Sequence, residues 1–253
     1  MTIRWLTVFL DSPYDSDREA GLAFWRGVTR SGLSSWRGER EEFATLLPEQ
    51  GCAFLRVQDV CDGPARCHLD VHSHAVRAEV ARAVKLGATI VADQNTLVVL
   101  ASPGGLAFCV VTHHGEHERP VPLRWTDGHR SLVDQICLDI PAGALDREVE
   151  FWAAFTGWER RPGSRPEFEY LQRPAGMPFR LLLQRLDTSE PGQPVRAHVD
   201  LACDDVEAEV RRHEQLGATV VGRTASWVTL RDPVGREYCV TSRDPVTGLL
   251  PPT

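Results

Sequence analysis

The chain has 253 residues, of which 42% are hydrophobic and 25% are charged, and its formal net charge is −7. This composition is that of a soluble globular protein, and the length suits two domains better than one. The acidic balance argues against a nucleic-acid partner, because phosphate binding needs a clustered basic face. No apolar run approaches the roughly 20 residues of a membrane span, so we expect no membrane partner.

The cysteines indicate a reducing compartment. There are seven, an odd number, and no CxxC pair occurs. Several lie inside apolar, strand-like segments, so we expect buried thiols in a cytoplasmic protein rather than a disulfide framework. The N-terminal segment has one basic residue and a short alternating apolar run, which predicts a strand and not a signal peptide.

The first quarter of the chain predicts one helix among several strands. Apolar residues at helical spacing run through residues 18–28, and Gly32 is a stop signal after them. Period-2 patterns and turn residues predict strands over 4–10, 42–47 and 53–57.

The third quarter repeats this plan. We expect a helix over 146–155, closed by Gly157, and strands over 132–140, 167–171 and 179–184. Trp25 and Trp152 fall at the same place in the two helices, which predicts that both anchor the core.

The second and fourth quarters are near copies of each other. The segments 66–111 and 196–241 align without a gap, and both read as strand, helix, strand and hairpin. In the fourth quarter Asp204 and Glu207 are spaced as a capping box. The aligned pairs include His68 with His198, Gly87 with Gly217, Pro103 with Pro233, and Cys109 with Cys239.

Four modules of one type predict an α+β protein in which βαβββ units pair into two domains with curved mixed sheets. We place the first domain at residues 1–112, a linker rich in proline, histidine and charge at 113–130, the second domain at 131–243 and an irregular tail at 244–253.

The repeated segments resemble the vicinal oxygen chelate superfamily. The motifs that carry the resemblance are HVDLACDDVEAEV, LGATVV and DPVGREYCV, with HLDV, AEVARAVKLGATIV and FCVV in the first copy. This superfamily includes glyoxalase I, extradiol dioxygenases, fosfomycin-modifying enzymes and bleomycin-binding proteins. The resemblance is greatest to bacterial glyoxalase-like proteins with two such domains, and because the superfamily shares a fold, it narrows the function only to a set of reactions.

The resemblance implies a divalent metal ion, such as nickel, zinc, manganese or iron, in the second half. The metal-ligand positions of the superfamily fall on Gln135, His198 and Glu237, and a fourth falls near Gln184. All are oxygen or nitrogen donors, and Glu237 would also be the catalytic residue. In the first half the corresponding positions hold Thr7, His68 and Ala107, which predicts no metal there.

Each of these residues also has a structural interpretation. His198 could be a hydrogen-bonded strand histidine, because His68 repeats it in a half without the other ligands. Glu237 could face solvent at a hairpin edge. Asp70 and Asp200 share a strand face with their histidines and could orient them.

Three aromatic residues have no counterpart in the other half. We expect Trp36, Tyr170 and Trp227, together with His68, to contact a small organic ligand, although simple packing is the alternative. We expect the linker histidines His113, His114 and His117 to be solvated, and His72 and His74 to face water.

Two functions remain open at this point. The first is a metal-dependent lyase, isomerase or dioxygenase that acts on a small molecule with neighbouring oxygen atoms. The second is a metal-free binding protein for a drug or metabolite. In either case the chain would act as a monomer or a homodimer.

Overall fold

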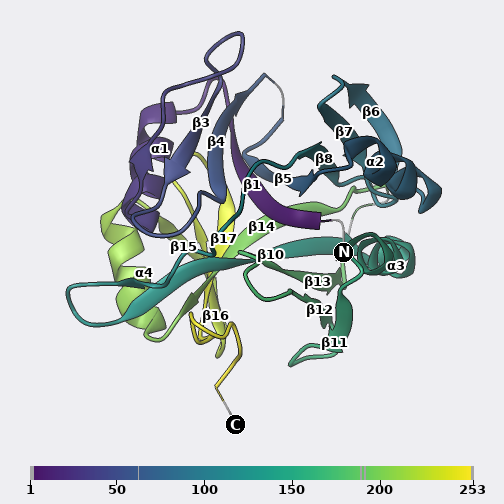
Figure 1. Cartoon of the computed structure of the whole chain (residues 1–253). Coiled ribbons are helices and arrows are strands. Elements are labelled where there is room, and N and C mark those ends of the chain that lie inside the picture. Colours follow the sequence, from purple (N-terminus) through teal and green to yellow (C-terminus); the bar gives the residue numbers. More distant parts are fainter. Residues whose placement is uncertain (1–2, 62, 189, 191, 252–253) are drawn as a thin grey trace. The chain divides into compact units, whose positions relative to one another are not determined.

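The computed structural model describes residues 3–61, 63–188, 190 and 192–251 (Figure 1). The first module consists of β1 (Ile3–Pro13), α1 (Arg18–Thr29), β2 (Gly32–Leu33), β3 (Phe43–Leu47) and β4 (Leu55–Val60). The second consists of β5 (Arg66–Ser73), α2 (Val76–Lys85), β6 (Thr89–Asp93), β7 (Leu97–Ala101) and β8 (Ala107–Thr112).

A short strand, β9 (Leu123–Arg124), precedes the third module. That module consists of β10 (Arg130–Pro141), a 3-10 turn (Ala142–Ala144), α3 (Leu145–Thr156), β11 (Glu159–Pro162), β12 (Phe168–Gln172) and β13 (Arg180–Leu186). The fourth consists of β14 (Arg196–Cys203), α4 (Val206–Gln215), β15 (Thr219–Arg223), β16 (Trp227–Arg231) and β17 (Glu237–Thr241).

The strands form two mixed sheets. One has the order β2-β3-β4-β1-β5-β8-β7-β6, and the other has the order β11-β12-β13-β10-β14-β17-β16-β15, with β9 beside β10. The first and last strands of each order differ, so within the described residues neither sheet closes on itself. The contacts of β5 with β8 and of β14 with β17 are parallel, and the hairpins are antiparallel. The predicted α+β class is confirmed.

Of two helix ends predicted from local sequence signals, the structure confirms one and corrects the other. Gly157 closes α3 in the left-handed conformation (φ 67°), as expected. The predicted cap Asp204 is wrong by one residue, because the Asp205 carboxylate accepts the hydrogen bond from the Ala208 amide at the start of α4. Asp204 instead binds Arg130 at 2.9 Å.

Two compact units each combine modules from different repeats. One unit contains residues 1–8, 68–118 and 136–197, and the other contains 9–67, 119–135 and 198–253. In the first unit α2 packs with α3, and in the second the side chain of Arg212 from α4 donates to the Gly27 and Val28 carbonyl oxygens of α1. Figure 1 shows these helix pairs side by side.

A buried carboxylate joins the first and last modules in the second of these units. Asp232, in the turn between β16 and β17, accepts a hydrogen bond from Trp25 Nε1 at 2.8 Å. It also pairs with Arg236 at 2.6 Å. Arg236 is 2% exposed and donates further to the carbonyl oxygens of Asp11 and Arg66. One guanidinium therefore ties three segments together.

A matching carboxylate joins the second and third modules in the other unit. Glu148 is fully buried and accepts hydrogen bonds from Trp152 Nε1 at 2.8 Å and Ser102 Oγ at 2.6 Å. It also accepts one from the Gly104 amide at 2.7 Å. A Cβ at Gly104 would lie 2.5 Å from Val195 Cγ2 and 2.7 Å from Glu148 Oε2, so glycine lets the backbone come close to both side chains. Trp25 and Trp152 are each 1% exposed, as predicted for residues that anchor the core.

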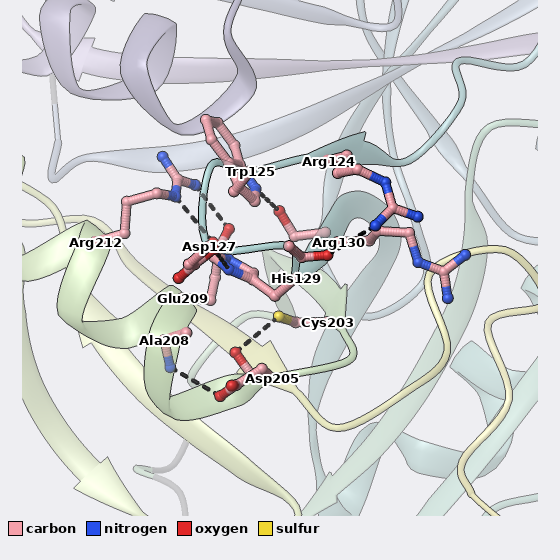
Figure 2. Close-up of polar contacts among 12 residues, drawn as sticks. Arg124, Trp125, Asp127, His129, Arg130, Cys203, Asp205, Ala208, Glu209 and Arg212 are labelled. Carbon is pink, nitrogen blue, oxygen red and sulfur yellow. Dashed lines mark hydrogen bonds and ion pairs between the residues drawn. The ribbon is translucent and has the colours of Figure 1, made fainter.

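A third network fixes the loop before β10 onto α4 (Figure 2). His129 lies between Asp127 and Glu209, and its Nε2 is 2.7 Å from the Glu209 carboxylate. Glu209 is fully buried and also binds Arg212 and His213. Burial alone would disfavour both charged forms, but these partners lower the pKa of Glu209 and raise that of His129.

Three further features concern the chain as a whole. All seven cysteines are thiols, and five of them are buried. Within the ranges given above, every helix is too short or too polar to cross a membrane. The expected tail begins with a turn in which the Gly248 amide donates to the Asp244 carbonyl oxygen, while Pro252 and Thr253 lie outside the described residues.

Removing the Asp232 carboxylate should strongly destabilise the fold. In Asp232→Ala the buried Arg236 loses its counter-charge, so we expect the free energy of unfolding to fall by about 3–5 kcal/mol in urea titrations. Asp187→Ala is the control, since that carboxylate is 81% exposed and should change stability by less than about 0.5 kcal/mol. A loss below about 1 kcal/mol in Asp232→Ala would contradict this role.

The contribution of His129 to stability should depend on pH. Because its pKa is raised above 6.5 in the fold, its extra stabilisation is complete below pH 6.5 and disappears as the pH rises through the folded-state pKa. We therefore expect His129→Gln to cost at least about 1 kcal/mol more near pH 6 than near pH 9. Urea titrations at both pH values measure this, and an equal cost at both would refute it.

Candidate metal and ligand site

Three donor side chains converge on neighbouring parallel strands in the unit that contains β14 and β17. His198 and Asp200 share one face of β14 because strand side chains alternate, and Asp200 lies opposite Cys239 of β17. His198 Nε2 is 3.3 Å from Asp200 Oδ1 and 3.8 Å from Cys239 Sγ. The three ligand atoms all lie within 4.8 Å of one another.

The surrounding residues orient this trio. The amide nitrogen of Gln135 donates to Asp200 Oδ2, and the Thr229 hydroxyl lies 3.5 Å from Cys239 Sγ. Asp200 is 2% exposed and Cys239 is 8% exposed, whereas the side chain of His198 is 17% exposed. The site is therefore nearly dry but is open on the histidine side.

The geometry differs from that of a nucleophilic triad. In a thiol–imidazole–carboxylate triad the acid binds one ring nitrogen and the nucleophile binds the other. Here Asp200 and Cys239 both approach Nε2 of His198. Three ligand atoms this close together could hold a metal ion.

Glu237 is not part of this trio. The antiparallel register places it opposite Arg231, and its carboxylate pairs with that guanidinium at 2.6 Å. Half of the Glu237 side chain is exposed. Cys239 lies two residues after Glu237 on the same face of β17. Its Sγ is 3.8 Å from His198 Nε2, next to the histidine where the sequence analysis had placed Glu237.

The other predicted ligands divide between the two units. Gln135 lies beside the trio, through Asp200. Gln184, the predicted fourth ligand, belongs to the other unit, where its amide oxygen is 3.4 Å from Cys137 Sγ.

The first repeat contains an equivalent trio. His68, Asp70 and Cys109 also offer three ligand atoms within 4.8 Å of one another, and His68 Nε2 is 4.0 Å from Asp70 Oδ1. Thr7, at the position that corresponds to Gln135, contacts His72 Nε2 at 3.0 Å.

The predicted ligand-contacting aromatics are all half-buried, and Tyr170 belongs to a different unit from Trp36 and Trp227. The Arg18 guanidinium lies 3.5 Å above the ring of Trp36, and that of Arg180 lies 4.6 Å from the ring of Tyr170. Trp227 begins β16, two residues from Thr229 and on the same strand face. Of the three, only Trp227 shares a strand with a residue that contacts the trio.

The solvent exposure of the linker histidines, and of His72 and His74, differs in part from the prediction. His113 is 6% exposed, His72 is 7% exposed, and the ring of His117 stacks on Trp5 with centroids 4.7 Å apart. The prediction that these residues are solvated is wrong for His72 and His113, and His117 is half-buried. His74 and His114 are exposed.

Cys239 was not proposed as a candidate ligand from the sequence. Its equivalence with Cys109 favoured a small core residue. The available signal was that both cysteines accompany a His-x-Asp strand, a pairing that packing does not require.

Comparison with known proteins identifies the fold family. A family model described as a glyoxalase-like domain matches twice, at residues 7–111 and 135–241. Both ranges lie inside the predicted domains 1–112 and 131–243. A comparison with curated proteins found no significant match.

Solved structures of the vicinal oxygen chelate superfamily share the fold. A Mn(II)-bound glyoxalase from Novosphingobium aromaticivorans has a TM-score of 0.64 at 17% identity, covering 99% of this chain and 87% of that one. A 4-hydroxymandelate synthase variant from Streptomyces coelicolor has a TM-score of 0.59 at 15% identity, covering 98% and 95%.

A 2,2',3-trihydroxybiphenyl 1,2-dioxygenase from Sphingomonas wittichii has a TM-score of 0.59 at 11% identity, covering 95% of this chain and 90% of its own. At these identities the likeness concerns the fold alone. The two matches to the family model span most of the sequence, and the chain therefore belongs to the glyoxalase-like domain family, with two copies of the domain in tandem.

Proposed function

We propose that the second repeat binds a divalent metal ion, best matched by zinc, through His198, Asp200 and Cys239, and presents it to a small organic molecule. The observation that carries this proposal is that three donor atoms on neighbouring parallel strands lie within 4.8 Å of one another. With three protein ligands, a tetrahedral ion keeps its fourth position for water or substrate.

The spacing of the donors fits this ion. Ligand atoms at about 2.0–2.3 Å from a tetrahedral ion lie about 3.3–3.8 Å apart. The distances from His198 Nε2 to Asp200 and Cys239 are 3.3 and 3.8 Å. A set of one imidazole, one carboxylate and one thiolate favours zinc over magnesium or manganese, because those two ions prefer sites made of oxygen ligands.

The chain's own residues prepare the site. The Gln135 amide holds one Asp200 oxygen and directs the other toward His198. The Thr229 hydroxyl can donate to the Cys239 thiolate and stabilise it. Bound zinc would supply Lewis-acid polarisation of a carbonyl or of adjacent oxygens in the substrate.

The donor set also narrows the reaction class. Oxygen-activating iron sites commonly use two histidines and one carboxylate, and a zinc ion has no redox chemistry. We therefore favour a lyase or isomerase acting on a carbonyl compound with neighbouring oxygens, ahead of ring cleavage by dioxygen. Trp227, on the same strand face as Thr229, is the aromatic that we assign to substrate contact.

Metal-free small-molecule binding is the second candidate, and a cavity supports it. A space of about 210 Å³ lies in the same unit as the trio, at the end of α1. Its lining includes the apolar residues Val28, Phe54, Val133 and Leu201 and the charged residues Arg30, Glu49 and Arg124. Such a pocket suits capture of a small apolar molecule without chemistry.

We further propose that the chain acts in the cytoplasm as a monomer or homodimer. The reduced state of its seven cysteines supports this compartment.

Cobalt(II) substitution tests the metal site directly. The wild-type protein should bind cobalt with the near-ultraviolet absorption of a thiolate–cobalt bond, because Cys239 is a ligand. Cys239→Ser should lose most of this band, and His198→Gln should weaken binding at least about 10-fold. Glu237→Gln is the matched control on the same strand face and should bind as the wild type does.

The same titration separates the alternatives. A band lost in Glu237→Gln but kept in Cys239→Ser would restore the ligand set expected from the sequence. A residual band that vanishes in Cys109→Ser would place a second metal in the first repeat. No thiolate band at all would contradict the metal proposal, and screening for apolar ligands of the cavity would follow.

A further inference from the structure

Histidines from two distant segments meet at the C-terminal ends of two inner strands of the first sheet. β5 and β8 are parallel neighbours in register, with His72 opposite Val111 and Ser73 opposite Thr112. The next residues along the two strands are His74 and His113, and the His113 amide donates to the Ser73 carbonyl oxygen at 2.9 Å. The sequences HSH and HHGEH are therefore brought together by strand pairing.

The imidazole rings are close to one another. The ring centroid of His113 is 4.7 Å from that of His74 and 4.7 Å from that of His117. His72 is further away, at 6.4 Å from His113 and 6.3 Å from His117, and its Nε2 contacts Thr7. The compact group is thus His74, His113 and His117, with His72 packed beside it.

Two of these rings carry buried nitrogens whose hydrogen-bonding capacity is unused. Nδ1 of His113 and Nδ1 of His117 have no hydrogen-bond partner among the described residues. Burying an imidazole nitrogen without a partner costs free energy.

The second repeat shows that the fold does not need these histidines. The positions equivalent to His74 and His113 hold Asp204 and Arg243. Arg243 forms a buried ion pair with Asp134 at 2.7 Å. The same strand ends are therefore stable with quite different chemistry, and packing alone does not explain three neighbouring imidazoles in the first repeat.

We propose that His74, His113 and His117 bind a divalent transition-metal ion such as nickel or zinc, at a site separate from the two His-Asp-Cys trios. Metal–nitrogen bonds of about 2.0–2.1 Å place ligand ring centroids about 4.5–5.2 Å apart at angles between right-angled and tetrahedral. The two distances of 4.7 Å lie in this range.

Binding requires the rings to rotate about χ2 so that their nitrogens face one another. These histidines are absent from the groups of described residues whose ligand atoms already lie within 4.8 Å. His74 is exposed, and Gly115, between His113 and His117, has a positive φ of 74°. Three imidazoles form an all-nitrogen site that suits nickel, copper or zinc.

The test uses nickel and the full chain in a Cys109→Ser/Cys239→Ser background, which removes the thiolates of the two trios. Calorimetry should show one equivalent of nickel bound, and X-ray absorption should show nitrogen and oxygen ligands only. Adding His113→Gln and His117→Gln should weaken binding at least about 10-fold. The exposed neighbour His114→Gln is the matched control and should leave binding unchanged.

A second variant guards against unfolding. His74 is exposed, so His74→Gln should keep the circular dichroism spectrum and thermal transition of its parent while losing nickel affinity. No nickel binding in the thiolate-free background, or binding that is unchanged in the histidine variants, would overturn the proposal. Because an all-histidine site gives no thiolate–cobalt absorption, the trio of the second repeat and the histidine site can fail independently of each other.

Discussion

A buried carboxylate that receives a tryptophan N–H is the interaction on which each compact unit depends. Trp25 and Asp232 are separated by 207 residues, yet their hydrogen bond is 2.8 Å long and fully buried. In the other unit Glu148 has the same role for Trp152, Ser102 and Gly104. A buried carboxylate without donors would be costly. Each helix is therefore held at one position over the hairpin turn that it covers.

This constraint reaches the candidate metal site through a hairpin. Asp232 and Arg236 lie in the turn between β16 and β17, and the strands leaving that turn carry Thr229 and Cys239. Because Arg236 is tied to the backbone of Asp11, the hairpin cannot shift its register without breaking buried polar contacts. A shift of one residue would turn Cys239 away from His198. The contacts that stabilise the turn therefore also fix the position of Cys239 relative to His198.

Most elements could be predicted from the sequence because their signals are local. Alternating apolar residues, helical spacing and Gly157 gave the main strands, the helices and one helix end. The pairing of modules across the repeats could not be predicted, because it depends on long-range contacts such as that of Arg236 with the Asp11 carbonyl oxygen. Glu237 was assigned as a ligand because a ligand position of the superfamily falls on it, whereas Cys239 was interpreted as a core residue. Its pairing with Arg231 is set by strand register, which hydropathy does not show.

Comparing the two repeats separates what the fold requires from what it permits. Both repeats keep a His-x-Asp strand beside a cysteine, so any difference in metal binding must come from the residues around the trios. Gln135 and Thr7 occupy corresponding positions beside the two trios. Gln135 donates a hydrogen bond to Asp200, whereas the Thr7 hydroxyl contacts His72 Nε2. At the ends of the parallel strands the repeats diverge further. One buries an arginine–aspartate pair there, and the other gathers imidazoles. A tandem architecture thus allows the two copies to carry different side chains at equivalent positions of the same fold.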